Sequence, residues 1–216
     1  MAARGGPAAE AAGAADDAMG GPGAWPSKAA ARLAGLPLVA YPLRVLTEVC
    51  TRVAIVCKRD TALPETPGVE RWDEPDEPRH PLTGLVHALD RAGEPVLLCA
   101  ADMPFVTAGA CRALLAASPL AGAGGATAPP ARRHRDRDGP LAVVATTEDR
   151  ELEPLLGVYL PRALPTLASA PADAPLRRSV AALEPVRVPI PRRLLRSVNT
   201  PAELATAEDE LAGPVR

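Results

Sequence analysis

The residues best suited to chemistry surround Asp102, at the end of a short run without polar side chains. Residues 96–101 have the length of a strand that is buried on both faces, and Pro104 prevents a simple continuation of its hydrogen-bond ladder. Loops diverge at the carboxyl end of such a strand, so open α/β sheets bind ligands there. A carboxylate in that position suits a divalent cation held against phosphate oxygens. The alternative is that Asp102 only caps a helix predicted over residues 107–117.

A glycine-rich segment before Lys28 is the second candidate for chemistry. Gly20 and Gly21 precede this lysine, which is one of only two lysines among 24 basic residues. Glycine lets backbone N–H groups approach phosphate oxygens closely, so the segment favours a phosphate-binding loop. Its spacing differs from that of a Walker A loop. The alternative is a flexible linker.

Length, charge and composition indicate a single-domain protein and give no sign of nucleic-acid or membrane binding. The 216 residues fit one domain, and we expect a low-complexity, mobile segment over residues 1–24 followed by a single domain over residues 25–212. A net charge of −2 and an aromatic content of 2% do not indicate nucleic-acid binding. No apolar run is long enough to span a membrane, and no secretory signal is visible. The four cysteines lack the spacing of a zinc site. From these observations together we expect a protein of the reducing cytoplasm.

The elements that must position these residues alternate between helices and apolar strands, which indicates a three-layer α/β fold. Helices are predicted over residues 40–49, from residue 81, over 107–117, 162–168 and 176–183, and strands over residues 53–57, 69–72, 96–101, 141–145, 155–160 and 186–190. A last helix is predicted to begin after Thr200, because Thr200 can cap it and Pro201 suits its first position.

Three sequence blocks resemble the molybdenum cofactor guanylyltransferases, a family within a larger superfamily of nucleotidyltransferases. Residues 97–105, LLCAADMPF, are similar to the family's strand that ends in an aspartate. The segment ERWDEPDEPRHPLTGL has Asp73 at the family spacing, with His80 where a glycine is usual. The segment SVNTPAELATAE is similar to the family's last block, with Ser197 in place of an asparagine.

The family's first block, a strand running into LAGGxSxRMGxDK, matches this chain least. Lys28 stands where the signature lysine belongs, whereas the signature arginine and the aspartate before the lysine are missing. Residues 8–18 contain no Val, Ile, Leu or aromatic residue, so their composition is unfavourable for a central strand. Either an unusual alanine-rich segment forms the strand that leads into the nucleotide-binding loop, or that loop is degenerate.

The resemblance implies a Rossmann-like α/β/α nucleotidyltransferase fold with a mostly parallel sheet. It implies an enzyme that transfers GMP from GTP to molybdopterin, releases pyrophosphate and uses Mg²⁺ as its cofactor. The implied partners are these two small-molecule substrates, with transient contact to molybdoenzyme maturation proteins and no nucleic acid or membrane. The implied site residues are Asp102 for the metal, Lys28 for the triphosphate, Asp73 for the guanine nucleotide, Gly20 and Gly21 for phosphate, and Asn199 on the acceptor side.

Three other functions remain to be weighed against this one. A cytidylyltransferase or a sugar-phosphate enzyme of the same superfamily would share these blocks. A non-catalytic member of the fold would bind a nucleotide without turnover, and the missing signature arginine and aspartate favour it. A phospho-acceptor signalling domain would also place an aspartate at a strand end, but its acidic pair on the first strand is not visible.

Overall fold

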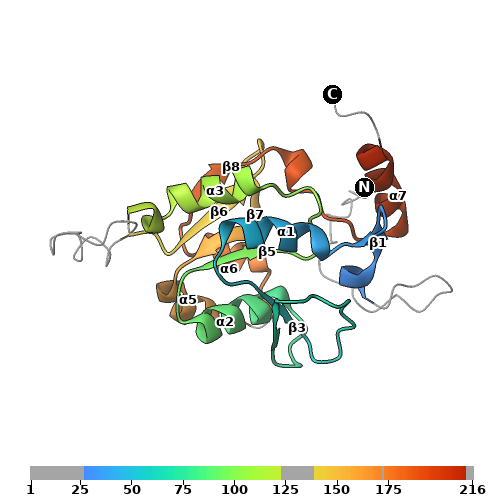
Figure 1. Ribbon diagram of the computed structural model, residues 1–216. Coiled ribbons are helices and arrows are strands. Elements are labelled where there is room, and N and C mark those ends of the chain that lie inside the picture. The colour runs from blue at the N-terminus through green and yellow to red at the C-terminus, as the bar shows by residue number, and fades with distance from the viewer. Residues whose placement is uncertain (1–26, 123–138, 172, 213–216) are drawn as a thin grey trace, which may run out of the picture.

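The computed structural model describes residues 27–122, 139–171 and 173–212 (Figure 1). The predicted low-complexity segment over residues 1–24, including Gly20 and Gly21, lies outside these residues. The α-helices are α1 (Ala40–Val49), α2 (Pro81–Ala92), α3 (Ala108–Ala117), α5 (Leu164–Ala168), α6 (Leu176–Ala181) and α7 (Pro201–Ala212). The strands are β1 (Arg32–Leu33), β2 (Leu36–Pro37), β3 (Ala54–Cys57), β4 (Glu70–Asp73), β5 (Val96–Cys99), β6 (Ala142–Thr146), β7 (Leu152–Tyr159) and β8 (Val186–Pro189). No described helix has the length and apolarity that a membrane span requires.

The main sheet has four strands in the order β5-β7-β6-β8, and β3 and β4 form a separate parallel pair. Strand β7 runs antiparallel to both β5 and β6, while β6 and β8 are parallel. The prediction of a mostly parallel sheet is therefore wrong for the main sheet, which is mixed. The physical reason is the connection from β6 to β7, because residues 147–151 are too few for the crossover that a parallel pair needs.

Helices cover both faces of the main sheet because successive side chains of a strand point to opposite faces. On one face Val144 and Tyr159 pack with side chains of α2, α5 and α6. On the other face Val143 and Val158 pack with side chains of α3. Figure 1 shows the same division, with α3 on one side of the sheet and α2, α5 and α6 on the other. The fold is thus of the α/β class, as predicted.

Helix α2 illustrates how the sequence determines an element beside the site. The Nδ1 atom of His80 accepts a hydrogen bond from the Leu82 N–H at 3.2 Å, and Pro81 occupies the first turn, where its missing N–H costs nothing. Leu82, Leu85 and Leu89 then share one face and are buried. Each such leucine contributes about 1.5–3 kcal/mol when fully buried. His80, to which the sequence assigns no role, is therefore the helix cap.

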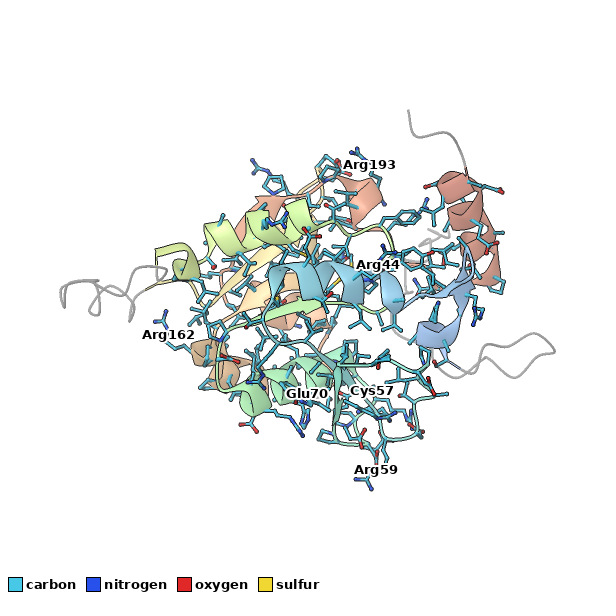
Figure 2. The ribbon with its side chains drawn as sticks, viewed as in Figure 1. Arg44, Cys57, Arg59, Glu70, Arg162 and Arg193 are labelled. Atoms are coloured by element: carbon cyan, nitrogen blue, oxygen red, sulfur yellow. The ribbon has the colours of Figure 1, made fainter. Side chains whose placement is uncertain are left out.

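Charged side chains lie mainly at the periphery. Figure 2 shows Arg59 and Arg193 projecting from the outside of the molecule, and both residues are exposed. By contrast, all five residues of β6 are buried. The two labelled arginines thus lie at the surface, away from the buried main sheet.

Candidate functional site

Asp102 lies in the turn that follows β5, at the carboxyl end of the strand. Helix α3 begins at Ala108, and its cap is Thr107, whose hydroxyl accepts a hydrogen bond from the Ala110 N–H at 3.3 Å. The alternative in which Asp102 only caps this helix is therefore wrong. Its carboxylate lies at the end of β5, five residues before that cap.

The carboxylate of Asp102 is largely withdrawn from water. Its Oδ1 atom is buried and has no hydrogen-bond partner within the described part of the chain. Burial raises the pKa of Asp102, and the charge of Lys28 and a hydrogen bond with Ser197 partly offset that rise. A buried polar atom without a partner costs free energy, so its presence calls for an explanation such as a missing ion or ligand.

Lys28 reaches the same place from the other end of the chain. It begins a short 3₁₀ turn, Lys28–Ala30, capped by Ser27, whose hydroxyl accepts a hydrogen bond from the Ala30 N–H at 3.2 Å. The Lys28 Nζ atom donates to the Oδ1 atom of Asn199 at 3.3 Å. The structure thus brings together three of the predicted site residues, Lys28, Asp102 and Asn199.

The segment that carries Asn199 is fixed at both ends. The Val198 N–H donates to the carbonyl of Asp102 at 2.9 Å. The carboxylate of Glu203 accepts from the N–H groups of Asn199 and Thr200 at 2.7 and 3.0 Å, while the Thr200 hydroxyl accepts from the Glu203 N–H at 3.2 Å. This reciprocal pattern is a capping box, and it confirms the predicted start of the last helix. Helix α7 thereby positions Asn199 beside Asp102.

A cavity of about 1340 Å³ adjoins these residues. Lys28 and Asp102 line it together with the whole of β3 and β5. Lys58 and Glu74, which follow β3 and β4, also line it. The cavity therefore has apolar walls and charged groups at the ends of the strands, which is typical of a ligand site in an α/β protein.

Asp73 is placed differently from the other predicted residues. It ends β4, and its carboxylate accepts a hydrogen bond from the Nε atom of Arg71 at 2.7 Å, which lowers the pKa of Asp73. Arg71 also donates to the carbonyls of Lys58 and Arg59 at 2.9 and 2.8 Å. Asp73 is not among the described residues that line the cavity. Its contact with the guanine nucleotide stays a prediction.

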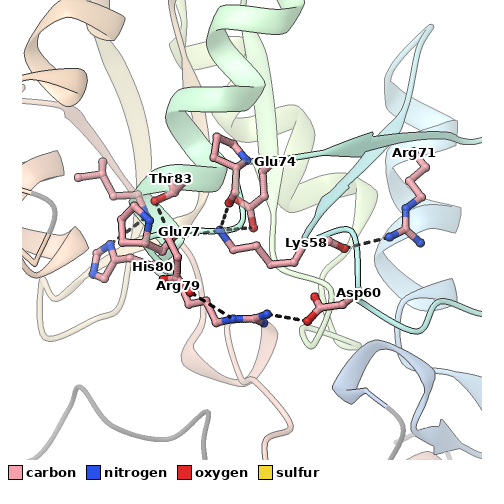
Figure 3. Close-up of polar contacts among 11 residues, drawn as sticks. Lys58, Asp60, Arg71, Glu74, Glu77, Arg79, His80 and Thr83 are labelled. Atoms are coloured by element: carbon pink, nitrogen blue, oxygen red, sulfur yellow. Dashed lines mark hydrogen bonds and ion pairs between the residues drawn. The ribbon is translucent and has the colours of Figure 1, made fainter.

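Sequence reasoning missed a buried ion pair between Lys58 and Glu74, two residues that also line the cavity (Figure 3). The Lys58 Nζ atom lies 3.5 Å from Glu74 Oε1 and donates to the carbonyls of Pro75 and Pro78. Lys58 is 8% exposed, and the Oε2 atom of Glu74 is buried without a described partner. The available signal was that Lys58 is the second of two lysines and directly follows a strand.

The donor set at Asp102 fits a magnesium ion bound with its substrate. No group of three or more Cys, His, Asp or Glu side chains among the described residues suits a metal ion. Mg²⁺ does not need such a group, because it keeps several waters and commonly binds one or two carboxylates together with substrate phosphates. Asp102 supplies one carboxylate with an unpartnered oxygen, and Lys28 supplies the cation beside it.

A carboxylate and a lysine beside the carboxyl end of a strand lie where α/β folds commonly bind ligands. A family model described as MobA-like NTP transferase domain matches residues 11–187. The chain belongs to this family, which makes it a nucleotidyltransferase by class. A comparison with curated proteins finds no match.

Solved structures show the same fold at low sequence identity. Molybdopterin-guanine dinucleotide biosynthesis protein A from Archaeoglobus fulgidus is 19% identical, with a TM-score of 0.59 over 86% of this chain and 90% of that chain. The 2-C-methyl-D-erythritol 4-phosphate cytidylyltransferase from Thermus thermophilus is 14% identical, with a TM-score of 0.58 over 87% of this chain and 96% of that chain. At these identities the likeness establishes the fold alone.

Proposed function

We propose that this protein transfers GMP from GTP to molybdopterin and releases pyrophosphate, with Mg²⁺ as its cofactor. The observation that carries the proposal is the convergence of Lys28, Asp102 and Asn199 at the end of β5, in a chain of the MobA-like family. The likeness to the Archaeoglobus fulgidus protein, whose name refers to molybdopterin-guanine dinucleotide biosynthesis, supports the choice of substrates.

The reaction joins two anions, and this determines what the site must supply. A phosphate oxygen of molybdopterin attacks the α-phosphorus of GTP. The bond from that phosphorus to the oxygen bridging to the β-phosphate breaks, and pyrophosphate leaves with the electron pair. The protein forms no covalent bond, so its contribution is positioning and positive charge.

Each residue has a distinct part in this proposal. Lys28 neutralises the triphosphate as a compact point charge. Asp102 holds Mg²⁺, which when bound neutralises phosphate charge and activates the α-phosphorus toward attack. Asn199 orients Lys28 through its amide oxygen and faces the acceptor. Asp73 contacts the guanine nucleotide, and Gly20 and Gly21, outside the described residues, donate backbone N–H groups to phosphate.

Cytidylyl transfer is the second candidate function. A specific observation favours it, because the Thermus thermophilus cytidylyltransferase matches this fold as well as the molybdopterin-guanine dinucleotide protein does, with TM-scores of 0.58 and 0.59. The fold therefore does not distinguish GTP from CTP as the substrate, and a binding experiment is needed to decide between them.

The test compares GTP, CTP, ATP and UTP, each with Mg²⁺, by thermal shift and by pyrophosphate release in the presence of molybdopterin. A ligand that binds only the native state stabilises it, by about 2.7 kcal/mol at a hundred times Kd. We expect GTP to raise the melting temperature most and to support turnover. A larger shift and turnover with CTP would replace the guanylyl assignment, and binding without pyrophosphate release would identify a non-catalytic member of the fold.

A further inference from the structure

The last helix, α7, is held on the domain by few apolar side chains. Of its residues, all of which the structure describes, only Ala207 is buried, and Leu204 packs partly against the same small cluster. This cluster, which contains Leu33, Leu38 and Val198, is separate from the two clusters that cover the main sheet. Figure 1 shows α7 beside β1, at one end of the molecule. Because α7 buries so little apolar surface, polar contacts must contribute much to its placement.

One such contact is a paired hydrogen bond between Arg196 and Glu210, which lies in the last turn of α7. The Nη1 and Nη2 atoms of Arg196 donate to the Oε1 and Oε2 atoms of Glu210 at 2.5 and 2.9 Å. A single-point ion pair at the surface contributes little to stability, whereas two parallel hydrogen bonds also fix the orientation of both groups. The pair therefore ties α7 to the segment that precedes it.

The same guanidinium lies over the ring of Phe105, the only phenylalanine in the chain. The Cζ atom of Arg196 is 4.3 Å from the ring centroid, which is within the range of about 6 Å for a cation–π contact. Phe105 belongs to the loop between β5 and α3, three residues after Asp102. Arg196 thus connects the loop that carries Asp102 to α7.

The three residues that follow Arg196 all contact the candidate site. Ser197 forms a hydrogen bond with the carboxylate of Asp102. The Val198 N–H donates to the carbonyl of Asp102 at 2.9 Å, and Asn199 accepts a hydrogen bond from the lysine of the site at 3.3 Å. The capping box of α7 fixes this segment on its carboxyl side. Arg196 is placed to fix it on the other side.

We propose that Arg196 is a positioning residue for nucleotidyl transfer, because it holds residues 197–199 against the turn at Asp102. The inference rests on the proposed function, since a metal ion and a triphosphate are the ligands that this alignment serves. The guanidinium is engaged by Phe105 and Glu210, so it acts on the site through the segment that follows it. Lysine cannot replace it fully, because only a planar guanidinium stacks on a ring and donates two parallel hydrogen bonds at once.

Hydrogen exchange of the protein without ligand tests whether Arg196 holds this segment. We expect the Val198 amide to exchange at least about tenfold faster in Arg196→Met than in the native protein, with unchanged exchange in residues 142–146. Arg193→Met, which removes an exposed arginine of the neighbouring turn Arg192–Leu194, is the matched control and should exchange like the native protein. Equal exchange of Val198 in the two variants would overturn the proposal.

The dependence of turnover on Mg²⁺ separates positioning from stability. We expect Arg196→Met to raise by about tenfold the Mg²⁺ concentration that gives half-maximal pyrophosphate release, and Arg196→Lys to restore only part of the loss. A smaller folded fraction would lower kcat and leave that concentration unchanged, and this result would overturn the proposal. If the native protein released no pyrophosphate with any of the four nucleotides, the proposed function and the role of Arg196 in transfer would both be refuted. The exchange of Val198 would still show separately whether Arg196 fixes the segment.

A substitution of the partner keeps the test decisive if Arg196→Met does not fold. Glu210 is exposed, and Glu210→Gln removes the charge but keeps the size of the side chain, so we expect the same changes at about threefold. The double variant Arg196→Met/Glu210→Gln should be no worse than Arg196→Met alone, because the two side chains act as a unit. Additive effects of the two substitutions would contradict the proposal.

Discussion

The Nζ atom of Lys28 lies 3.3 Å from the amide oxygen of Asn199, although 171 residues separate them in the chain. Both lie beside Asp102, whose carbonyl accepts a hydrogen bond from Val198 and whose carboxylate is stabilised by the Lys28 charge. The candidate site is therefore assembled from the first, middle and last parts of the described chain.

Asp102→Asn should strongly reduce magnesium-dependent nucleotidyl transfer while the fold persists. The amide keeps the shape of the side chain but loses the negative charge that would hold the cation, and we expect kcat to fall by about 10²-fold or more. Pyrophosphate release at saturating Mg²⁺ measures the effect. Asp90→Asn, an exposed position on α2, is the matched control and should retain activity. Normal turnover of Asp102→Asn would remove the metal role.

Lys28→Ala should weaken nucleotide binding. The lysine would be the point charge closest to the triphosphate, so we expect Kd for the preferred nucleotide to rise by about tenfold, or about 1.4 kcal/mol. Isothermal titration with Mg²⁺ present gives the comparison. Arg44→Ala removes an exposed cation of α1 and should leave Kd unchanged (Figure 2). If both variants bind equally well, Lys28 lies in a linker and does not contact phosphate.

Asp102 should make the metal-free protein less stable as the pH rises. Burial raises its folded-state pKa above the value of about 3.9 in an unfolded chain, so the fold favours the protonated form. The contribution of Asp102 to the free energy of unfolding, compared with that of asparagine, is therefore fully present below the unfolded-state pKa. It is lost as the pH rises through the folded-state pKa.

Melting curves in a chelating buffer measure this effect. Near pH 4 the two proteins should melt together, and near pH 7.5 the variant should melt higher, by about 2–4 °C for each kcal/mol. A constant difference across this range would show that the carboxyl group titrates alike in the folded and unfolded states.

Glu203 should act on the site through the backbone of Asn199. Glu203→Ala removes the acceptor for the N–H groups of Asn199 and Thr200, and it should cost about 1 kcal/mol of stability and reduce kcat. Glu203→Gln keeps a carbonyl acceptor and should restore most of both. Chemical denaturation and initial rates give the two readouts. A Gln variant as impaired as the Ala variant would point to the charge of Glu203 rather than to its hydrogen bonds.

Gly84→Ala should lower the stability of the protein, whereas Gly109→Ala should leave it unchanged or raise it. A Cβ atom at residue 84 would lie 2.9 Å from the buried Oε2 atom of Glu74, whose Oε1 atom lies 3.5 Å from the Nζ atom of Lys58. We expect a net loss of about 1–2 kcal/mol, despite the gain of about 1 kcal/mol that alanine brings to a helix. At residue 109 the nearest atom would be 3.8 Å away, so that variant should be neutral or stabilised. Equal melting temperatures would exclude this role for the Glu74–Lys58 pair.

Local patterns predicted most of the elements correctly. The leucines of α2 recur at helical spacing, and the cap at Thr200 with Pro201 and Glu203 is a local signal, so both helices begin where the sequence indicates. The sequence points to Asp102 because an apolar strand ends there, although the residues of β5 are half-buried rather than buried on both faces as predicted. Elements of this kind depend on residues close together in the chain.

Relationships between distant segments were harder to predict. The antiparallel course of β7 follows from the short connection at residues 147–151, whereas the family resemblance implied a mostly parallel sheet. The pairing of Lys58 with Glu74 depends on the register of β3 and β4, in which Cys57 lies opposite Asp73. No periodicity in the sequence specifies that register.

The contact between Lys28 and Asn199 has a consequence during synthesis of the protein. The ribosome makes the strands of the main sheet, and Asp102 with them, before it makes Asn199 and the helix that holds it. In a nascent chain that has emerged only as far as β8, the amide oxygen that accepts the hydrogen bond from Lys28 has not yet been made. The site of the proposed function is therefore complete only after α7 has been made.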